Sequence, residues 1–324
     1  MSLMGLRIAA TVLLGTSLLT VAGSVLGEMV ATMPPLFREE AVDAIVRQGI
    51  QYEEVAFPTG EGLTLRGWFF PADRPDAPAI VYAPATAHDQ RSGLSLVPAL
   101  HAADYHVLLF SYRGHALSDG NRWGFTYGDA ESRDLDAAVR FLQESRGLGP
   151  IGVIGHSAGA VSGILSAARN PEIGAVVAVA PFTCVDEVWA TNRPTVVPQP
   201  LLDLTLRLAE MRKGFDRRSV CTLDAVHLIA PRPLLIIHGT QDQRITQEQV
   251  HRLFAAAEEP KSLWLVEGAS HNSVRDPMLD QLMPKVIAFL DNALRAQEKQ
   301  LTSPVAQLDG EMVGEREPAP SLAN

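Results

Sequence analysis

Short apolar runs alternate with longer amphipathic stretches along most of the chain. The runs at 79–83, 106–110, 151–154 and 175–180 hold almost no polar side chains, which is typical of strands buried on both faces. Between them, residues 129–144 place apolar side chains at helical spacing. The same alternation continues with strands predicted at 233–237 and 262–266 and helices at 247–257 and 277–294.

The first strands differ from the later ones. Residues 55–57 and 63–70 are separated by the turn-forming stretch 58–62 and predict a β-hairpin. Residues 36–48 predict a short amphipathic helix before that hairpin. A hairpin followed by alternating strands and helices predicts an α/β fold with a mostly parallel, doubly wound sheet and antiparallel N-terminal strands.

One interval interrupts this alternation. Residues 182–230 contain no clear strand and one helical pattern at 201–211. Long insertions at the active-site edge of an open sheet usually cover that site, so we expect a lid here. Cys184 and Cys221 flank the lid's helix, and they are either bridged, if this part of the protein is exported, or two buried free thiols.

The N-terminus carries an uncharged segment, residues 8–27, preceded by Arg7 and ended by Glu28. Its 20 residues are enough to span a bilayer. We therefore expect residues 1–34 to be a membrane anchor and linker, with the body exported to the periplasm or the extracellular side. Small residues at 22–24 leave an alternative, a cleaved signal segment and a secreted protein.

Charge and composition limit the remaining possibilities. The net charge of −10 argues against nucleic acid as a partner. Two cysteines without a CxxC or Cys/His cluster suggest no structural metal. From residue 296 onward the chain is polar, acidic and contains three prolines, which predicts a disordered tail over 296–324. The globular domain is therefore expected over 35–295.

Ser157 is the first candidate for chemistry. It lies in Gly155-His156-Ser157-Ala158-Gly159, between a predicted strand and a predicted helix. A serine at a sharp strand–turn–helix apex is a nucleophile elbow, and the strained turn requires small residues two positions before and after it. Gly155 and Gly159 meet that requirement.

A serine hydroxyl needs a base, and the base needs an orienting group. Asp242 follows the predicted strand 233–237, and His271 follows the strand 262–266. The order Ser157, Asp242, His271 is that of the α/β-hydrolase arrangement. The sequence therefore predicts a triad of nucleophile, acid and base.

Each partner has an alternative explanation. Asp242 lies four residues before Thr246 and would also suit a helix cap, and His271 would also suit a surface loop. Asp186, beyond the strand at 175–180, is a competing acid. His88 is either a pocket residue or a structural one.

From about residue 50 to 295 the chain resembles the α/β-hydrolase superfamily, most closely its serine-aminopeptidase-like branch with membrane-anchored members. The resemblance rests on Tyr112 to Gly120, Gly155 to Gly159, Pro231 to Gly239 with Asp242, and Glu267 to His271. It implies Ser157 as nucleophile, Asp242 as acid and His271 as base. It also implies that the Arg113–Gly114 turn is structural.

The oxyanion hole departs from the family pattern. One donor is expected to be the backbone N–H of Ala158, and the other comes from the loop after strand 79–83. Relatives have His-Gly there, whereas this chain has Ala83-Pro84-Ala85-Thr86. Proline has no N–H, so Ala85 inherits the role, with Thr86 as the alternative.

These features predict a serine hydrolase that acts on a small ester or acyl substrate, including thioesters or amides, and that needs no cofactor. Acyl transfer to another acceptor would use the same triad. The rival from a different class is a membrane-tethered binding protein on a hydrolase fold, because a fold alone does not establish activity.

Overall fold

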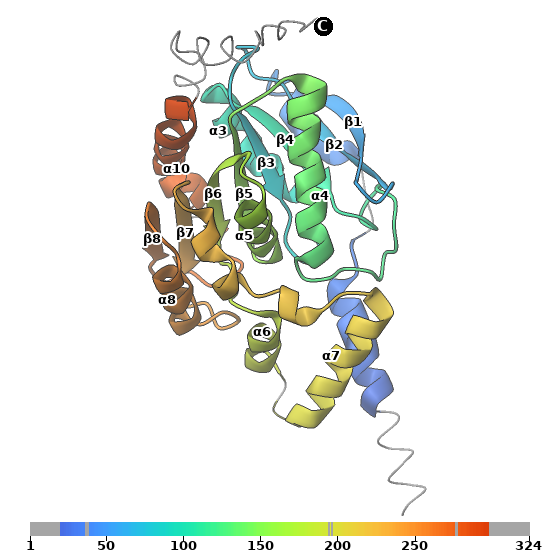
Figure 1. Cartoon of the computed structure of the whole chain (residues 1–324). Coiled ribbons are helices and arrows are strands. Elements are labelled where there is room, and N and C mark those ends of the chain that lie inside the picture. Colours follow the sequence, from blue (N-terminus) through green and yellow to red (C-terminus); the bar gives the residue numbers. More distant parts are fainter. Residues whose placement is uncertain (1–19, 36–38, 194, 196, 276–277, 298–324) are drawn as a thin grey trace, which may run out of the picture.

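The computed structural model describes residues 20–35, 39–193, 195, 197–275 and 278–297, and these contain one eight-stranded sheet (Figure 1). The strand order is β1-β2-β4-β3-β5-β6-β7-β8. The strands are β1 (Glu53–Pro58), β2 (Thr64–Phe70), β3 (Ala79–Ala83), β4 (His106–Ser111), β5 (Ile151–His156), β6 (Ile173–Val179), β7 (Leu234–Gly239) and β8 (Lys261–Val266).

Strand directions follow the predicted pattern. β1 pairs antiparallel with β2, and β2 pairs antiparallel with β4, whereas every pairing from β4 to β8 is parallel. The five strands from β4 to β7 are buried along their whole length, which explains their continuous apolar runs. The prediction of a mostly parallel, doubly wound sheet with an antiparallel start is confirmed.

Helices cover both faces of the sheet and enclose two cores. Helices α4, α5 and α8 pack on one face, and α3 and α10 pack on the other (Figure 1). The helices are η1 (Glu39–Val42), α2 (Asp43–Val46), η2 (Gln90–Leu96), α3 (Val97–Ala102), α4 (Asp129–Arg140), η3 (Phe141–Ser145), α5 (Ala158–Arg169), α6 (Val185–Thr191), α7 (Gln199–Lys213), η4 (Arg217–Ser219), η5 (Thr222–Asp224), η6 (Val226–Ile229), α8 (Gln247–Ala256), η7 (Met278–Leu282), α10 (Met283–Leu290) and η8 (Asp291–Arg295).

The segment expected as a lid forms α6, α7 and several short helical turns between β6 and β7. Cys184, just before α6, forms a disulfide with Cys221, just before η5. Their Cα atoms lie 4.0 Å apart although the two residues are 37 positions apart in sequence. The bridge therefore joins the beginning of the segment to the chain that leaves α7.

Residues 20–32 form a helix that lies beside α7 (Figure 1). This helix contains only the last part of the expected span 8–27, whose first residues lie outside the described part of the chain. No helix within the described residues combines the length and the hydropathy needed to cross a bilayer. Residues 298–324 of the expected tail also lie outside the described residues.

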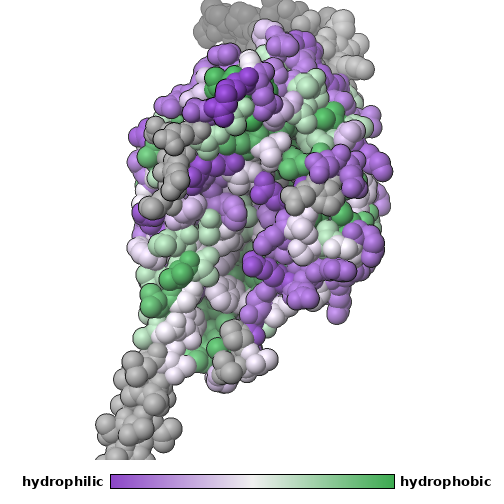
Figure 2. Space-filling model, turned by 180° about the vertical axis from the view of Figure 1, so that it is seen from behind, coloured by the Kyte–Doolittle hydropathy of each residue, from purple (hydrophilic) through white to green (hydrophobic). Residues whose placement is uncertain are grey.

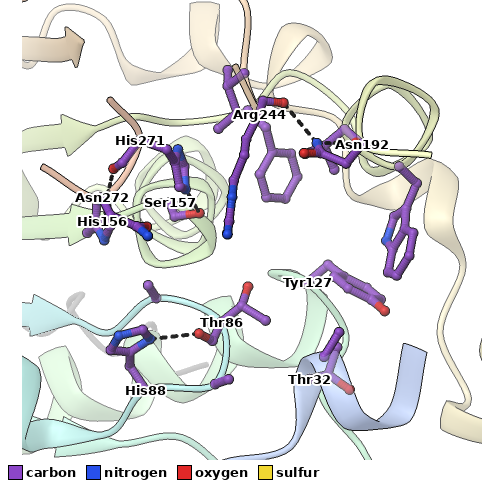
Figure 3. Close-up of a pocket in the computed structure, with 17 residues that line it drawn as sticks. Thr32, Thr86, His88, Tyr127, His156, Ser157, Asn192, Arg244, His271 and Asn272 are labelled. Atoms are coloured by element: carbon purple, nitrogen blue, oxygen red, sulfur yellow. Dashed lines mark hydrogen bonds between the residues drawn. The ribbon is translucent and has the colours of Figure 1, made fainter. Parts of the chain in front are cut away.

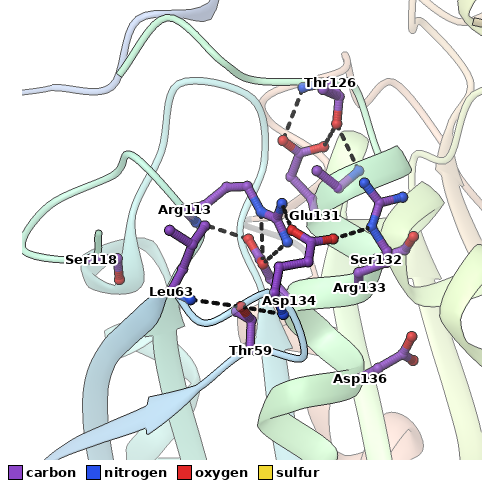
Figure 4. A network of polar contacts seen from close by, with 12 residues as sticks. Thr59, Leu63, Arg113, Ser118, Thr126, Glu131, Ser132, Arg133, Asp134 and Asp136 are labelled. Atoms are coloured by element: carbon purple, nitrogen blue, oxygen red, sulfur yellow. Dashed lines mark hydrogen bonds and ion pairs between the residues drawn. The ribbon is translucent and has the colours of Figure 1, made fainter. Parts of the chain in front are cut away.

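A polar network ties the N-terminal hairpin to the helical layer (Figure 4). Arg113, after β4, donates from its guanidinium to Asp134 of α4 at 2.9 and 2.7 Å and also pairs with Glu61 in the hairpin turn. The backbone N–H of Arg113 donates to the same carboxylate at 2.8 Å. None of these three residues lines the cavity described below, so their contacts hold elements of the fold together.

Candidate active site

Ser157 lies at the apex of a sharp turn between β5 and α5. Its backbone has φ 54° and ψ −119°, a combination that costs energy for any residue with a side chain. A Cβ on Gly155 would lie 2.4 Å from the carbonyl oxygen of Gly159. A Cβ on Gly159 would lie 2.0 Å from the carbonyl oxygen of Ala83. The turn therefore requires glycine at both positions.

The structure brings the three predicted triad residues together. His271, in the loop after β8, has Nε2 3.0 Å from the Ser157 Oγ atom (Figure 3). Its Nδ1 lies 2.7 Å from Oδ2 of Asp242, in the loop after β7. Because parallel strands end at the same edge of the sheet, three distant loops meet there.

The surroundings of Asp242 favour a carboxylate that orients a base. Its Oδ1 accepts from the backbone N–H groups of Arg244 and Ile245, both at 2.9 Å. Burial acts to raise the pKa of Asp242, but the His271 ring and these two N–H groups outweigh it and lower that pKa below its usual value. Asp242 is therefore ionised with both oxygens engaged.

The alternative roles for these loops do not match the contacts. The cap of α8 is Thr246, whose side chain accepts from the Gln249 N–H at 3.3 Å. The competing acid Asp186 is exposed and pairs with Arg217 at 3.2 Å. Of the two candidate acids, Asp242 is thus the one that faces His271.

His156, next to the serine, supports the loop that carries the candidate base. Its Nε2 lies 3.2 Å from the carbonyl oxygen of His271, to which a neutral ring donates. Burial, with a smaller contribution from the nearby His271 ring, lowers the pKa of His156 to about 3. The ring is therefore neutral at physiological pH and acts as a hydrogen-bond donor to that loop.

Three further histidines divide into two groups. His115 and His238 are buried and do not line the cavity. His88 lines the cavity, and its Nδ1 lies 2.8 Å from the carbonyl oxygen of Thr86 (Figure 3). Of the two interpretations of His88, the structure places it at the pocket.

Two backbone N–H groups near Ser157 are the candidates for an oxyanion hole. Ala158 is the first residue of α5, and Ala85 lines the cavity after β3. Gly159 lies against the carbonyl groups of Ala83 and Pro84, which brings the two segments into contact. Within the described part of the chain, neither the Ala158 nor the Ala85 N–H donates to another backbone carbonyl outside regular elements.

A cavity of about 590 Å³ opens beside Ser157. Its walls come from the N-terminal helix, the loops after β3 and before α4, the turn between β5 and α5, the segment between β6 and β7, and the loops after β7 and β8. Besides His156, Ser157, His271 and Asn272, its lining residues are Ala31, Thr32, Ala85, Thr86, Ala87, His88, Tyr127, Phe182, Val188, Trp189, Asn192, Arg244 and Ile245. Val188 and Trp189 come from the segment 182–230, expected to form a lid, and they contribute to this wall.

The N-terminal helix is held in this wall by a buried ion cluster. The carboxylate of Glu28 pairs with Lys213 and with Arg212 of α7, and it accepts from the Tyr127 hydroxyl. Lys213 Nζ also donates to the Phe125 carbonyl at 2.7 Å and lies 4.8 Å from the centre of the Tyr127 ring. The sequence does not predict this cluster, although Glu28 is the first charge after the apolar segment.

Electrostatics in the cluster favour the charged form of the acid. Burial acts to raise the pKa of Glu28, but the positive charge and hydrogen bonds of Lys213, with Tyr127 and Arg212, lower it below its usual value. Ala31 and Thr32 follow Glu28 on the same helix and reach the cavity. Pairing at Glu28 therefore positions part of the pocket wall.

No group of three or more His, Cys, Asp or Glu side chains within the described residues is arranged to hold a metal ion. The arrangement instead offers a hydroxyl, an imidazole and a carboxylate in hydrogen-bond contact, beside two backbone donors. Such a set suits acyl chemistry at a carbonyl carbon.

The strand order, the strained serine turn and the three loops at one sheet edge define an α/β-hydrolase fold. A family model described as serine aminopeptidase, S33, matches residues 85–227. The structure of the Pyrococcus furiosus esterase Pf2001 superposes with a TM-score of 0.65 at 23% identity, covering 81% of this chain and 99% of that one. That likeness shows the fold.

Two bacterial proteins of similar sequence identify the family to which the chain belongs. The chain is 32% identical over 229 residues to the uncharacterized protein Rv2307c of Mycobacterium tuberculosis, covering 70% of this chain and 73% of the relative. It is 29% identical over 253 residues to the uncharacterized protein YqkD of Bacillus subtilis, covering 75% and 81%. The chain belongs to the family of these bacterial proteins and has the α/β-hydrolase fold.

Proposed function

We propose that the protein is a serine hydrolase that cleaves carboxylic esters through an acyl-enzyme on Ser157. The observation that carries the proposal is the continuous contact from the Ser157 hydroxyl through His271 to Asp242, at 3.0 and 2.7 Å. Thioesters and amides would follow the same route. No cofactor takes part in it.

The proposed reaction begins when Ser157 Oγ attacks the ester carbonyl carbon and its proton passes to His271 Nε2. Asp242 holds the Nδ1–H of His271 and stabilises the imidazolium. The N–H groups of Ala158 and Ala85 face the oxyanion. As the carbon–oxygen bond to the alcohol breaks, His271 returns the proton to the leaving alcohol. Water then repeats these steps and releases the acid.

The cavity lining supports a substrate with a sizeable apolar part. Tyr127, Phe182, Val188, Trp189 and Ile245 present apolar surface within a volume that suits a small-molecule substrate. Val188 and Trp189, from the segment expected as a lid, therefore favour a hydrophobic acyl or alcohol part.

The direct test is labelling of the purified protein by a fluorophosphonate, together with hydrolysis of a chain-length series of p-nitrophenyl esters. Wild type should take the label and cleave the esters, and Ser157→Ala should fold but lose both properties. Ser145→Ala, an exposed serine outside the cavity, is the matched control and should behave as wild type. Folded wild type that takes no label and cleaves no ester would refute the proposal in favour of a binding protein.

Acyl transfer to an acceptor other than water is the second candidate. The lid residues Val188 and Trp189 in the cavity wall favour it, because partial exclusion of water gives an acceptor alcohol an advantage over hydrolysis. Product analysis with added alcohols distinguishes the two. Free acid as the main product identifies a hydrolase, and a new ester as the main product identifies a transferase.

We further propose that residues 8–27 anchor the protein in a membrane, with the hydrolase domain exported. Leu26 and Val30 are exposed at 59% and 57%, while Glu28 on the same helix is buried, so the apolar side of this helix faces outward. Figure 2 shows hydrophobic side chains at the end of the molecule where this helix and α7 lie. The Cys184–Cys221 disulfide suits an oxidising compartment. Membrane fractionation and the N-terminal mass of the protein separate anchoring from signal cleavage and secretion.

A further inference from the structure

Arg244, an exposed residue, places a positive charge at the wall of the candidate substrate cavity. It lies in the loop after β7, two residues beyond Asp242, and its side chain points into the cavity between Ser157 and Tyr127 (Figure 3). The cavity lining contains no aspartate or glutamate among the described residues. Ion pairs between described residues involve many arginines of this chain, but none of them involves Arg244.

The backbone of Arg244 is fixed even though its side chain has no acidic partner in the cavity. Its N–H donates to Asp242 Oδ1 at 2.9 Å, and its carbonyl oxygen accepts from Asn192 Nδ2 at 2.9 Å (Figure 3). The root of the side chain is therefore held between the triad loop and the end of α6. Only the guanidinium is left to adjust to a bound molecule.

Asp242, two residues away in the sequence, forms its ion pairs with histidines and none with this guanidinium. Its Oδ2 binds His271, and its Oδ1 accepts two backbone N–H groups. Acidic residues outnumber lysines and arginines in the whole chain, 37 to 27. The cavity lining shows the opposite, because among the described residues it contains Arg244 and no acidic residue. A guanidinium in that position offers its N–H groups to a planar or tetrahedral oxyanion.

We infer that the natural substrate is an ester that carries an anionic oxygen group, a carboxylate or a phosphate, which binds Arg244 while the carbonyl lies at Ser157. This inference rests on the proposed esterase function and names its substrate class. The apolar part of the substrate then lies against Tyr127, Phe182 and Trp189. Arg244 is a specificity-determining residue under this inference, because it contacts the substrate's charge and not the reacting bond.

The test compares two p-nitrophenyl esters of equal length, one ending in a carboxylate and one in the neutral amide. Wild type should show a kcat/KM about tenfold or more higher for the carboxylate ester, the advantage expected of hydrogen bonds to a charged group. The preference should shrink as ionic strength rises, because the cavity is open to salt. A phosphonate-ended ester compared with the carboxylate-ended one identifies which anion fits better.

Arg244→Gln should abolish the preference, mainly through KM, so that kcat/KM for the carboxylate ester falls to the value that the same variant shows for the neutral ester. Arg244→Lys keeps the charge but loses the planar fork, so it should retain part of the preference. Arg140→Gln, an exposed arginine at the end of α4 outside the cavity, is the matched control and should change neither ester.

Two results would overturn the inference while leaving the esterase proposal intact. One is equal kcat/KM for the charged and neutral esters in wild type. The other is an equal loss on both esters in Arg244→Gln, which would show that Arg244 acts on the reaction itself. Hydrolysis of neither ester by folded wild type would instead refute the esterase proposal, and the inference would fall with it.

Discussion

Replacement of Glu28 by alanine tests whether the N-terminal helix is part of the working pocket. Glu28 is 2% exposed, and the Lys213 side chain that pairs with it is 0% exposed. Removing the carboxylate leaves a buried ammonium without its counter-ion, a change that costs about 3–5 kcal/mol in buried ion pairs. Arg212 is partly exposed and can turn to water, so its loss adds little.

The lost ion pairs join the helix at 20–32 to α7. We therefore expect this helix to undock locally before the whole protein unfolds. A docking loss of about 3–5 kcal/mol corresponds to roughly a hundredfold to several-thousandfold faster amide exchange in residues 20–32. Exchange in β5 and β6 should stay at the wild-type rate. Since Ala31 and Thr32 line the cavity, KM for ester substrates should rise at the same time.

Hydrogen–deuterium exchange by mass spectrometry measures both regions in one experiment. Glu53→Ala is the control, because its pair with Arg146 is exposed and is worth about 1 kcal/mol or less. The double variant Glu28→Leu/Lys213→Met should recover much of the protection, because it leaves no unpaired buried charge. Unchanged exchange in residues 20–32 together with an unchanged KM in Glu28→Ala would refute the reasoning.

The docking of the N-terminal helix should depend on pH, and the pKa of Glu28 gives the direction of that dependence. The pKa of Glu28 is lowered in the folded protein from its ordinary 4.5, so its stabilising contribution is complete above that ordinary value. The contribution is lost as pH falls through the lower folded value. Protection of residues 20–32 should therefore be constant above about pH 5 and decline in more acidic solution, and Glu28→Ala should remove this decline.

Two further changes test the triad and the elbow, and one tests the pocket wall. Asp242→Asn should lower kcat by about 10⁴ because His271 loses its tautomer-fixing partner, while Asp186→Asn should keep wild-type activity. Gly159→Ala should fold poorly or lose acylation, since its Cβ would lie 2.0 Å from a backbone oxygen, as thermal melting and fluorophosphonate labelling would show. A chain that begins at residue 35 should bind esters with a higher KM than one that begins at residue 20, and equal KM values would contradict the wall's role.

The sheet could be predicted because its central strands are buried on both faces. Burial of that kind demands continuous apolar runs, which remain visible without any knowledge of the partners. The predicted strand at 79–83 matches β3 residue for residue, and the runs at 106–110 and 151–154 lie within β4 and β5. The helix at 129–144 instead ends as α4 at Arg140 and continues as a π-helical turn, a change of hydrogen-bond register that periodicity does not distinguish.

The contacts of the candidate triad could be anticipated because fold topology alone brings the loops together. Ser157, Asp242 and His271 each follow a parallel strand, and such strands end at one edge. Arg244 and Glu28 could not be found in this way. Their importance depends on which charges face them, and a sequence does not show that the cavity around Arg244 lacks acids or that Lys213 is buried beside Glu28.

The N-terminal helix also shows why hydropathy alone gave an incomplete interpretation of residues 8–27. A uniformly apolar segment carries no indication of which side faces the protein, yet the helix at 20–32, which begins within that segment and continues beyond it, turns Glu28 and Thr32 inward and Leu26 and Val30 outward. The small residues at 22–24 precede Glu28, so cleavage there would spare both the ion cluster and the wall residues Ala31 and Thr32. An anchored and a processed protein would then share one pocket, and enzyme assays would not tell them apart. Only the N-terminal mass and membrane fractionation decide between them.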